Sequence, residues 1–228
     1  LNTCFMVTTP EIRFLIDCGA TSLVAMNRQG VDPNSIDMIL LTHLHGDHFG
    51  GVVFLLVHAH SASKRDRPLL IAGPKTTQKR VMEALESLYP GSSKNPWRFE
   101  LSFEEYEVEQ VWRSGPVSLI AYQAAHKAGE GPACALRITV DGKTLAYSGD
   151  GAWSDGLAKA AAGADLFIAE ANFYDKEVSF HMNLKTLTAH LDEIAPKRLI
   201  LTHMDEDMLE RADSLDFETA HDGKIVEI

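Results

Sequence analysis

The sequence has little cysteine, no long apolar run and comparatively little basic charge. Its three cysteines, an odd number and widely spaced, do not form a disulfide framework, so we expect reduced core thiols and a cytoplasmic location. The longest apolar run, at 52–57, is far shorter than the roughly 20 residues that cross a bilayer, and no charged-then-apolar leader marks export. These features predict a compact globular protein that does not act in a membrane.

Basic residues are outnumbered by acidic ones. The chain has 21 Lys and Arg against 32 Asp and Glu, a net charge of −11. Because such a chain does not attract a polyanion at long range, we expect that a large RNA is not its partner. One basic stretch runs from Lys64 to Arg80; we interpret it as solvated loop and helix charge, with steering of a phosphate as the alternative.

What the sequence does contain is a cluster of metal-binding side chains at 42–48, directly after an apolar, strand-like run. His43 and His45 point the same way from extended backbone, and a glycine lets the chain bend so that Asp47 and His48 face a second ion. Imidazole and carboxylate ligands suit zinc, iron or manganese. The cluster therefore predicts a dinuclear metal site at the end of a strand.

Three further candidate ligands, His126, Asp150 and His203, each close another strand-like segment. Side chains at one end of adjacent strands converge, so these residues can join the cluster at 42–48. Alone, each would be an ordinary polar residue at a strand end. Together they form a candidate set for two metal ions.

Strands interleaved with helices indicate a layered α/β architecture. Proline and glycine boundaries predict helices at 20–29, 74–89 and 183–194. The apolar segment 51–57 fits a core helix or a dimer surface, which leaves a homodimer possible. The expected strands are 4–8, 12–17, 36–42, 69–73, 98–103, 106–112, 116–125, 133–140, 144–149, 165–170, 198–202 and 224–228.

With these residues in place, the chain resembles the metallo-β-lactamase-fold hydrolases, whose HxHxDH motif matches 43–48. The resemblance covers nearly the whole chain and implies an α/β fold, a four-layer αββα sandwich, as one domain over 1–228, with a further N-terminal strand expected before Leu1. It implies two divalent ions, zinc first, with manganese or iron as alternatives. By the same resemblance, one ion would be held by His43, His45 and His126, the other by Asp47, His48 and His203, with Asp150 bridging them.

Two segments resemble the ribonuclease Z-like branch of phosphodiesterases within this family. That branch places a glutamate after the fourth strand ligand, here Glu170, and a histidine in an HST-like motif, here His181 followed by Met182-Asn183 in place of Ser-Thr. The resemblance implies that His181 protonates the leaving alkoxide, that Glu170 holds its imidazole, and that Asp47 takes or orients the proton of the attacking water. The alternative is a His181 that caps the following helix.

The sequence also bears on the size of the substrate. The interval between His126 and Asp150 has no room for the arm with which tRNA-processing members clasp tRNA, and the short stretch after His203 disfavours glyoxalase II-type thioester hydrolases. We therefore expect a metal-dependent phosphodiesterase that acts on a small phosphodiester. A lactone or thioester hydrolase of the same fold is the alternative, and a non-catalytic metal-binding protein is the third possibility.

Overall fold

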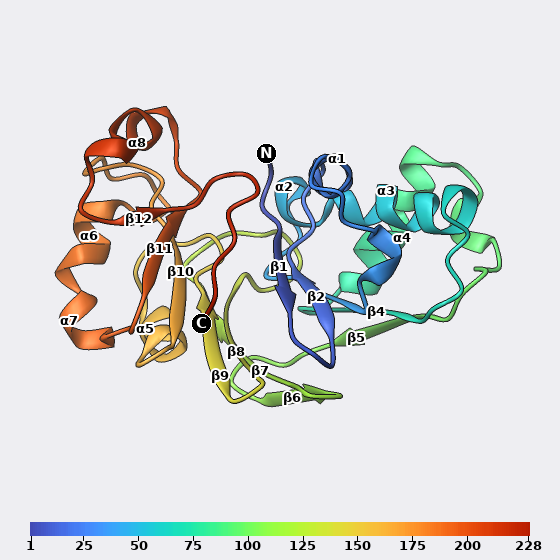
Figure 1. Ribbon diagram of the computed structural model, residues 1–228, viewed down its shortest axis with the longest axis horizontal. Helices are drawn as coiled ribbons and strands as arrows, with labels where there is room; N and C mark the ends of the chain where they lie inside the picture. The colour runs from blue at the N-terminus through green and yellow to red at the C-terminus, as the bar shows by residue number, and fades with distance from the viewer. The chain divides into compact units, whose positions relative to one another are not determined.

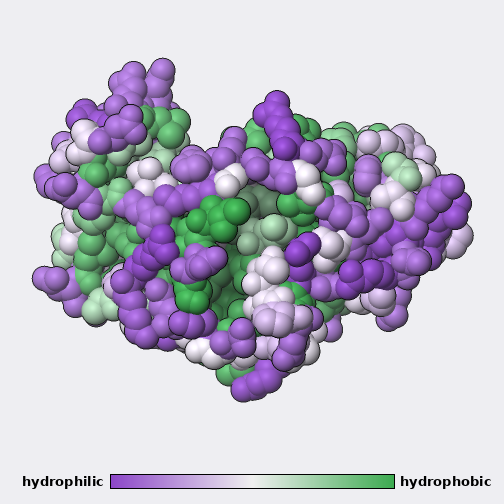
Figure 2. Space-filling view, in the orientation of Figure 1, coloured by the Kyte–Doolittle hydropathy of each residue, from purple (hydrophilic) through white to green (hydrophobic).

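The computed structural model describes residues 1–228, which divide into two compact units (Figure 1). The first unit comprises 1–106 and 128–131, and the second comprises 107–127 and 132–228. In Figure 2 the visible face of each unit presents mostly hydrophilic residues, with smaller apolar areas among them. None of the helices combines the length and the apolar character that a bilayer crossing requires.

The first unit contains a five-stranded sheet in which consecutive strands are neighbours. The first pair is antiparallel and the other three pairs are parallel. Parallel strands bring their carboxyl ends to the same edge of a sheet, so the segments that follow β2 and β3 meet there. The strands are β1 (Phe5–Thr8), β2 (Arg13–Ile16), β3 (Met38–Leu40), β4 (Leu69–Gly73) and β5 (Leu101–Glu105).

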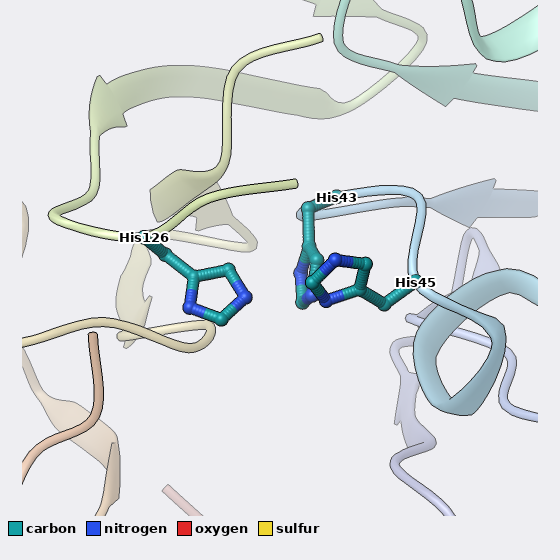
Figure 3. Close-up of side chains that lie close together, drawn as sticks. All are labelled: His43, His45 and His126. Atoms are coloured by element: carbon teal, nitrogen blue, oxygen red, sulfur yellow. The ribbon is translucent and has the colours of Figure 1, made fainter. Parts of the chain in front are cut away.

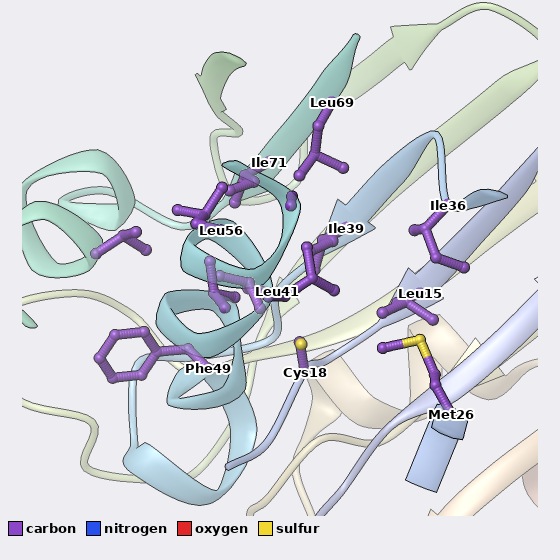
Figure 4. Packing of buried hydrophobic residues seen from close by; sticks show 14 of the residues in the cluster. Leu15, Cys18, Met26, Ile36, Ile39, Leu41, Phe49, Leu56, Leu69 and Ile71 are labelled. Atoms are coloured by element: carbon purple, nitrogen blue, oxygen red, sulfur yellow. The ribbon is translucent and has the colours of Figure 1, made fainter. Parts of the chain in front are cut away.

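Helices cover one face of this sheet and share a hydrophobic core with it (Figure 4). Leu56 packs in the same buried cluster as Ile39 and Ile71, and full burial of such a side chain contributes about 1.5–3 kcal/mol to folding. The apolar segment 51–57 therefore forms a core helix. The helices are α1 (Ser22–Arg28), α2 (Gly46–Phe49), α3 (Gly51–Val57), continued by a π-helix at His58–Ala62, and α4 (Thr77–Leu88).

Arg65 departs from the interpretation of the basic stretch as solvated charge. Its side chain is 1% exposed. The guanidinium donates to the backbone carbonyls of Asn34, Ile36, Arg67 and Pro68. A buried guanidinium surrounded by carbonyl acceptors holds the chain segments that carry those carbonyls together, because its planar fork satisfies several carbonyls at once.

The second unit contains a seven-stranded mixed sheet in the order β12-β11-β10-β9-β8-β7-β6. Pairs from β6 to β9 are antiparallel and pairs from β9 to β12 are parallel. Here too the loops after the parallel strands share one edge. The strands are β6 (Val111–Ser114), β7 (Val117–Gln123), β8 (Cys134–Val140), β9 (Lys143–Tyr147), β10 (Leu166–Glu170), β11 (Leu199–Thr202) and β12 (Glu218–Thr219).

Small side chains let the helices of the second unit lie close to its sheet. Ala160 and Ala161 are fully buried in a cluster that also contains Ala146 and Phe167 of the sheet. Alanine at such contacts permits close approach, because it fills little space and loses no side-chain entropy. The helices are α5 (Asp155–Ala161), α6 (Leu184–Ala189), α7 (Leu191–Ile194) and α8 (Glu206–Arg211).

Several expected elements differ in the structure. The stretch 224–228 is not a strand, and the edge strand β12 lies earlier in the chain. The expected helix at 183–194 is interrupted at His190, which ends one helix and precedes the next. Strand 98–103 is displaced to 101–105, strand 106–112 is replaced by 111–114, and helices α5 and α8 were not expected.

The cysteines are free, as expected. Cys18 and Cys134 are buried and Cys4 is partly buried. Burial raises the pKa of the Cys4 thiol to about 11 and that of Cys134 to about 12. Because the thiolate is the reactive form, these raised pKa values disfavour reaction of the thiols at neutral pH.

Candidate functional site

The cluster at 42–48 lies at the carboxyl end of β3 in the first unit. Figure 3 shows the imidazoles of His43 and His45 side by side on the loop that follows this strand, with ring centroids 4.8 Å apart. The His48 ring, on α2, lies 4.1 Å from that of His43, and Asp47 Oδ2 lies 3.4 Å from His48 Nε2. The structure thus gathers the four candidate ligands of this segment at one point.

Asp17 is a member of this site that the sequence reasoning missed. It follows β2, is fully buried, and has a left-handed φ of 57°. Its Oδ2 accepts from His48 Nδ1 at 2.7 Å, and its carboxylate also accepts from the backbone N–H and hydroxyl of Thr42. Burial raises the pKa of the Asp17 carboxyl, while the hydrogen bonds from His48 and Thr42 act in the opposite direction.

The sequence signal that could have identified Asp17 is its position as a polar residue directly after an apolar strand. Its neighbours Leu15 and Ile16 are fully buried, yet Asp17 follows them directly. The parallel pairing of β2 with β3 then brings it beside the loop that carries His48. The sequence distance between these residues concealed the contact.

Four candidate residues meet at the edge of the second unit's sheet. Ligand atoms of Asp150, Glu170, His181 and His203 all lie within 4.8 Å of one another. Glu170 Oε1 accepts from His181 Nδ1 at 2.5 Å and lies 3.2 Å from His203 Nδ1. His203 Nε2 lies 3.3 Å from Asp150 Oδ1.

Glu170 is held by backbone donors as well as by the histidines. Its side chain is fully buried, and Oε2 accepts from the N–H groups of Gly151 and Met182. The hydrogen bond to Glu170 raises the pKa of His181, although partial burial of the ring lowers it. The contact expected between Glu170 and His181 is therefore present, and it favours the protonated imidazole.

His126 follows β7 on the second unit, and its imidazole is drawn in Figure 3. Its Nδ1 donates to the carbonyl oxygen of Phe180 at 2.9 Å, and its ring centroid lies 5.3 Å from that of His181. Phe180 has a φ of 69°, which is strained for a bulky residue. That strained turn directs the carbonyl to His126, and Phe180 as a whole is 39% exposed, so it is not a core residue.

A shared pattern links four of the candidate histidines. In each of them a protein oxygen lies close to Nδ1. For His43 it is the hydroxyl of Thr42, at 3.0 Å. For His48, His126 and His203 it belongs to Asp17, to the Phe180 carbonyl and to Glu170. Metal-ligating histidines almost always engage a protein group through one ring nitrogen and bind the metal through the other. The donor set of imidazoles and carboxylates, held in this way, fits divalent metal ions.

The chain belongs to the beta-lactamase superfamily. The family model described as "Beta-lactamase superfamily domain" matches residues 12–204. A protein named Ribonuclease Z from Mycobacterium bovis (strain BCG / Pasteur 1173P2) is 26% identical over 212 residues, covering 83% of this chain and 75% of the relative. Matches to two other proteins of that name cover 32% and 24% of their length, so the chain spans a third or less of those relatives.

Solved structures show the same fold. Human tRNase Z, short form, is 21% identical with a TM-score of 0.78, covering 100% of this chain and 92% of that one. A diphosphatase from the PhnP family is 20% identical with a TM-score of 0.77, covering 100% and 85%. The expected metallo-β-lactamase fold, in a family of metal-dependent hydrolases with ribonuclease Z relatives, is confirmed.

Proposed function

We propose that this chain is a dinuclear metal-dependent hydrolase that cleaves a small phosphodiester. The superfamily supports the hydrolase class. The observation that carries the proposal is the set of histidines held through Nδ1, together with the buried carboxylate that fixes His181. A proton donor held in this way matters most when the leaving group is a poor one, as an alkoxide is.

The proposed ligands follow the family motif. When bound, the ions would supply Lewis acidity and electrostatic stabilisation of the reacting phosphate. Zinc is our first choice because imidazole and carboxylate suit it, with manganese or iron as alternatives. The family model covers sequence from both units, so we propose that 1–228 acts as one hydrolase domain. We assign His43, His45 and His126 to one ion, Asp47, His48 and His203 to the other, and Asp150 to both.

We propose His181 as the general acid. Glu170 accepts the hydrogen bond from Nδ1, which leaves Nε2 as the ring atom that delivers a proton to the leaving oxygen. Because the same hydrogen bond raises the pKa of His181, the imidazole keeps its proton closer to neutral pH. Glu170 is a positioning residue, since its backbone donors hold it in place.

Asp47 is the proposed acceptor of the proton from the attacking water. Its side chain is 45% exposed, whereas the neighbouring His48 is fully buried. A carboxylate that reaches solvent at the site can exchange protons with bulk water. Asp47 therefore orients the water in addition to acting as a ligand.

The first test is His181→Ala, assayed on two phosphodiesters that differ only in the leaving group. We expect the metal content to stay unchanged and the rate on an alkyl ester to fall by about 10²–10⁴. A nitrophenyl ester should lose far less, because nitrophenolate leaves without protonation. His221→Ala, an exposed histidine, is the matched control.

Equal losses on the two esters, or no loss on either, would contradict the general-acid role. A lactone and a thioester, assayed beside the phosphodiesters with a chelator-treated control, test the reaction class. Turnover of either in preference to both phosphodiesters would replace the phosphodiesterase by the alternative hydrolase. Absence of metal-dependent turnover on all four would favour a metal-binding protein without catalytic activity.

A further inference from the structure

The first unit has a hollow that the proposed chemistry does not use. Its volume is about 330 Å³, and it is bounded by the start of α4 and by the loop 128–131. His45 lines it on one side. Since His45 is one of the proposed metal ligands, a group bound in this hollow would lie beside the reacting phosphate.

Two cations of the basic stretch line the hollow, Lys79 and Arg80. Lys79 Nζ lies 2.7 Å from Glu130 Oε2 and 3.9 Å from Glu83, and Arg80 pairs with Glu83 at 3.2 Å. Two carboxylates therefore offset two cations. If the Glu130 carboxylate moved away, these side chains would carry a net positive charge.

Glu130 reaches Lys79 from a short loop flanked by glycines. The loop backbone packs against the turn before α4, because a Cβ on Gly131 would come within 2.6 Å of the Lys75 carbonyl oxygen. The Glu130 side chain is 64% exposed and that of Lys79 is 54% exposed, so the pair is weak and solvent-screened. An anion with more charge can displace this carboxylate without moving the loop backbone.

The start of α4 offers a further polar group to such an anion. Thr76 precedes the helix with a φ of 76°, and no side chain caps the helix there. The Thr76 hydroxyl oxygen is buried and has no hydrogen-bond partner, although Thr76 lines the hollow. A buried hydroxyl of this kind is satisfied when a ligand oxygen binds beside it.

We propose that this hollow binds a phosphomonoester group carried by the substrate in addition to its scissile diester. Lys79 and Arg80 are its cations, and Glu130 occupies the place of the phosphate until substrate binds. A phosphomonoester carries about −1.5 to −2 charges at neutral pH, more than the single carboxylate that it displaces. This inference rests on the proposed function, because it specifies further which substrates the same site would take.

The test compares thymidine 5′-(4-nitrophenyl phosphate) with the same ester carrying a 3′-phosphate. In the metal-loaded protein, the 3′-phosphate should lower KM about tenfold, the effect of one good charge-assisted contact. Lys79→Met should remove that difference. Glu130→Gln should enlarge it, because the competing charge is gone. Lys94→Met, another exposed lysine of the same unit, should leave both KM values unchanged.

Binding measured without turnover separates this inference from the proposed function. Calorimetry should show tighter binding of thymidine 3′,5′-bisphosphate than of thymidine 5′-monophosphate, with the difference lost in Lys79→Met. If neither ester is cleaved but this difference is present, the proposed function fails and the phosphate subsite stands. Equal binding of the two nucleotides, or a preference that survives Lys79→Met, would overturn the subsite.

Discussion

A histidine ligand must present one particular ring nitrogen to a metal, and the other nitrogen decides which one is presented. Asp17 engages Nδ1 of His48, which we propose as a ligand, and leaves Nε2 for the metal. The carboxylate also anchors the backbone of Thr42, so it fixes both the ring and the start of the loop that carries His43. A single buried carboxylate thereby organises the first half of the proposed ligand set.

Asp17→Asn tests this role. Asparagine tolerates the left-handed backbone and keeps the shape of the side chain, so the fold should be retained. If His48 is a metal ligand as proposed, the affinity for that metal should fall about 10- to 100-fold, because outer partners of ligating histidines contribute that much. Metal retained after dialysis against graded chelator concentrations measures the loss, and circular dichroism checks the fold.

Asp66→Asn, at an exposed position of the same unit, is the control. An Asp17→Asn protein that retains metal as tightly as the wild type would contradict the orienting role.

At the residue scale, the sequence identified candidate residues that lie close together in the structure, but it missed the carboxylate that holds one of them. The segment 43–48 could be interpreted because four donor groups lie within six positions. Glu170 and His181 were found through the family resemblance, and the structure places them in contact. Asp17 was missed because its contact with His48 depends on strand pairing, and the strained turn at Phe180 has no sequence signal.

At the scale of elements, buried strands were predicted well and exposed ones poorly. The strands β4 and β10 have buried residues nearly throughout and match their expected bounds closely. The displaced segments near 98–112 are largely exposed, so the apolar pattern that marks a strand is weak there. The stretch 224–228 is mostly apolar in the sequence but pairs with no strand, and Ile225 is 87% exposed.

The two-residue strand β12 depends on ion pairs rather than on apolar burial. Glu218 accepts two hydrogen bonds from the Arg198 guanidinium, and Lys224 Nζ lies 3.0 Å from the same carboxylate. Hydrogen bonds from Arg198 and Lys224 lower the pKa of Glu218 to about 2. This interaction joins the residue that precedes β11 to an edge that the apolar pattern does not specify.

Glu218→Gln tests the ion pair through its pH dependence. Because the folded pKa is lowered, the stabilisation is present above the unfolded value of about 4.5 and is lost as the pH falls from there toward 2. We expect the substitution to lower the free energy of unfolding by about 1 kcal/mol at pH 7 and by clearly less at pH 3. Urea unfolding at the two pH values measures this difference.

Glu210→Gln, an exposed residue of α8, should change neither value. The same loss at both pH values would show that Glu218 acts through packing rather than charge.

At the scale of the whole molecule, the net charge of −11 bears on which substrates can approach. Proteins that bind nucleic acid gain most of their affinity from cations that neutralise backbone phosphates. In the first unit the exposed cations Lys79 and Arg80 are already paired with carboxylates. We therefore expect a long polyanion to gain little on contact, whereas a small substrate needs only local charge.

A tRNA precursor with a 3′ trailer should consequently be cut poorly, or not at all, by protein that hydrolyses a thymidine nitrophenyl ester. The assay compares initial rates on both substrates at two salt concentrations, with a ribonuclease Z relative as positive control. Any RNA cleavage should lack the steep decrease with salt that marks phosphate-driven binding. Efficient trimming at one position of the 3′ end would overturn the expectation.

The path of the chain through its two units sets an order of events during synthesis. The first unit has its whole sheet by residue 106, but its segment 128–131 follows β6 and β7 of the second unit. On the ribosome, Lys79 thus emerges long before its partner Glu130, and chains fold as they emerge. Until two strands of its neighbour have been translated, Lys79 of the nascent first unit lacks its Glu130 partner, so the hollow beside His45 is finished late.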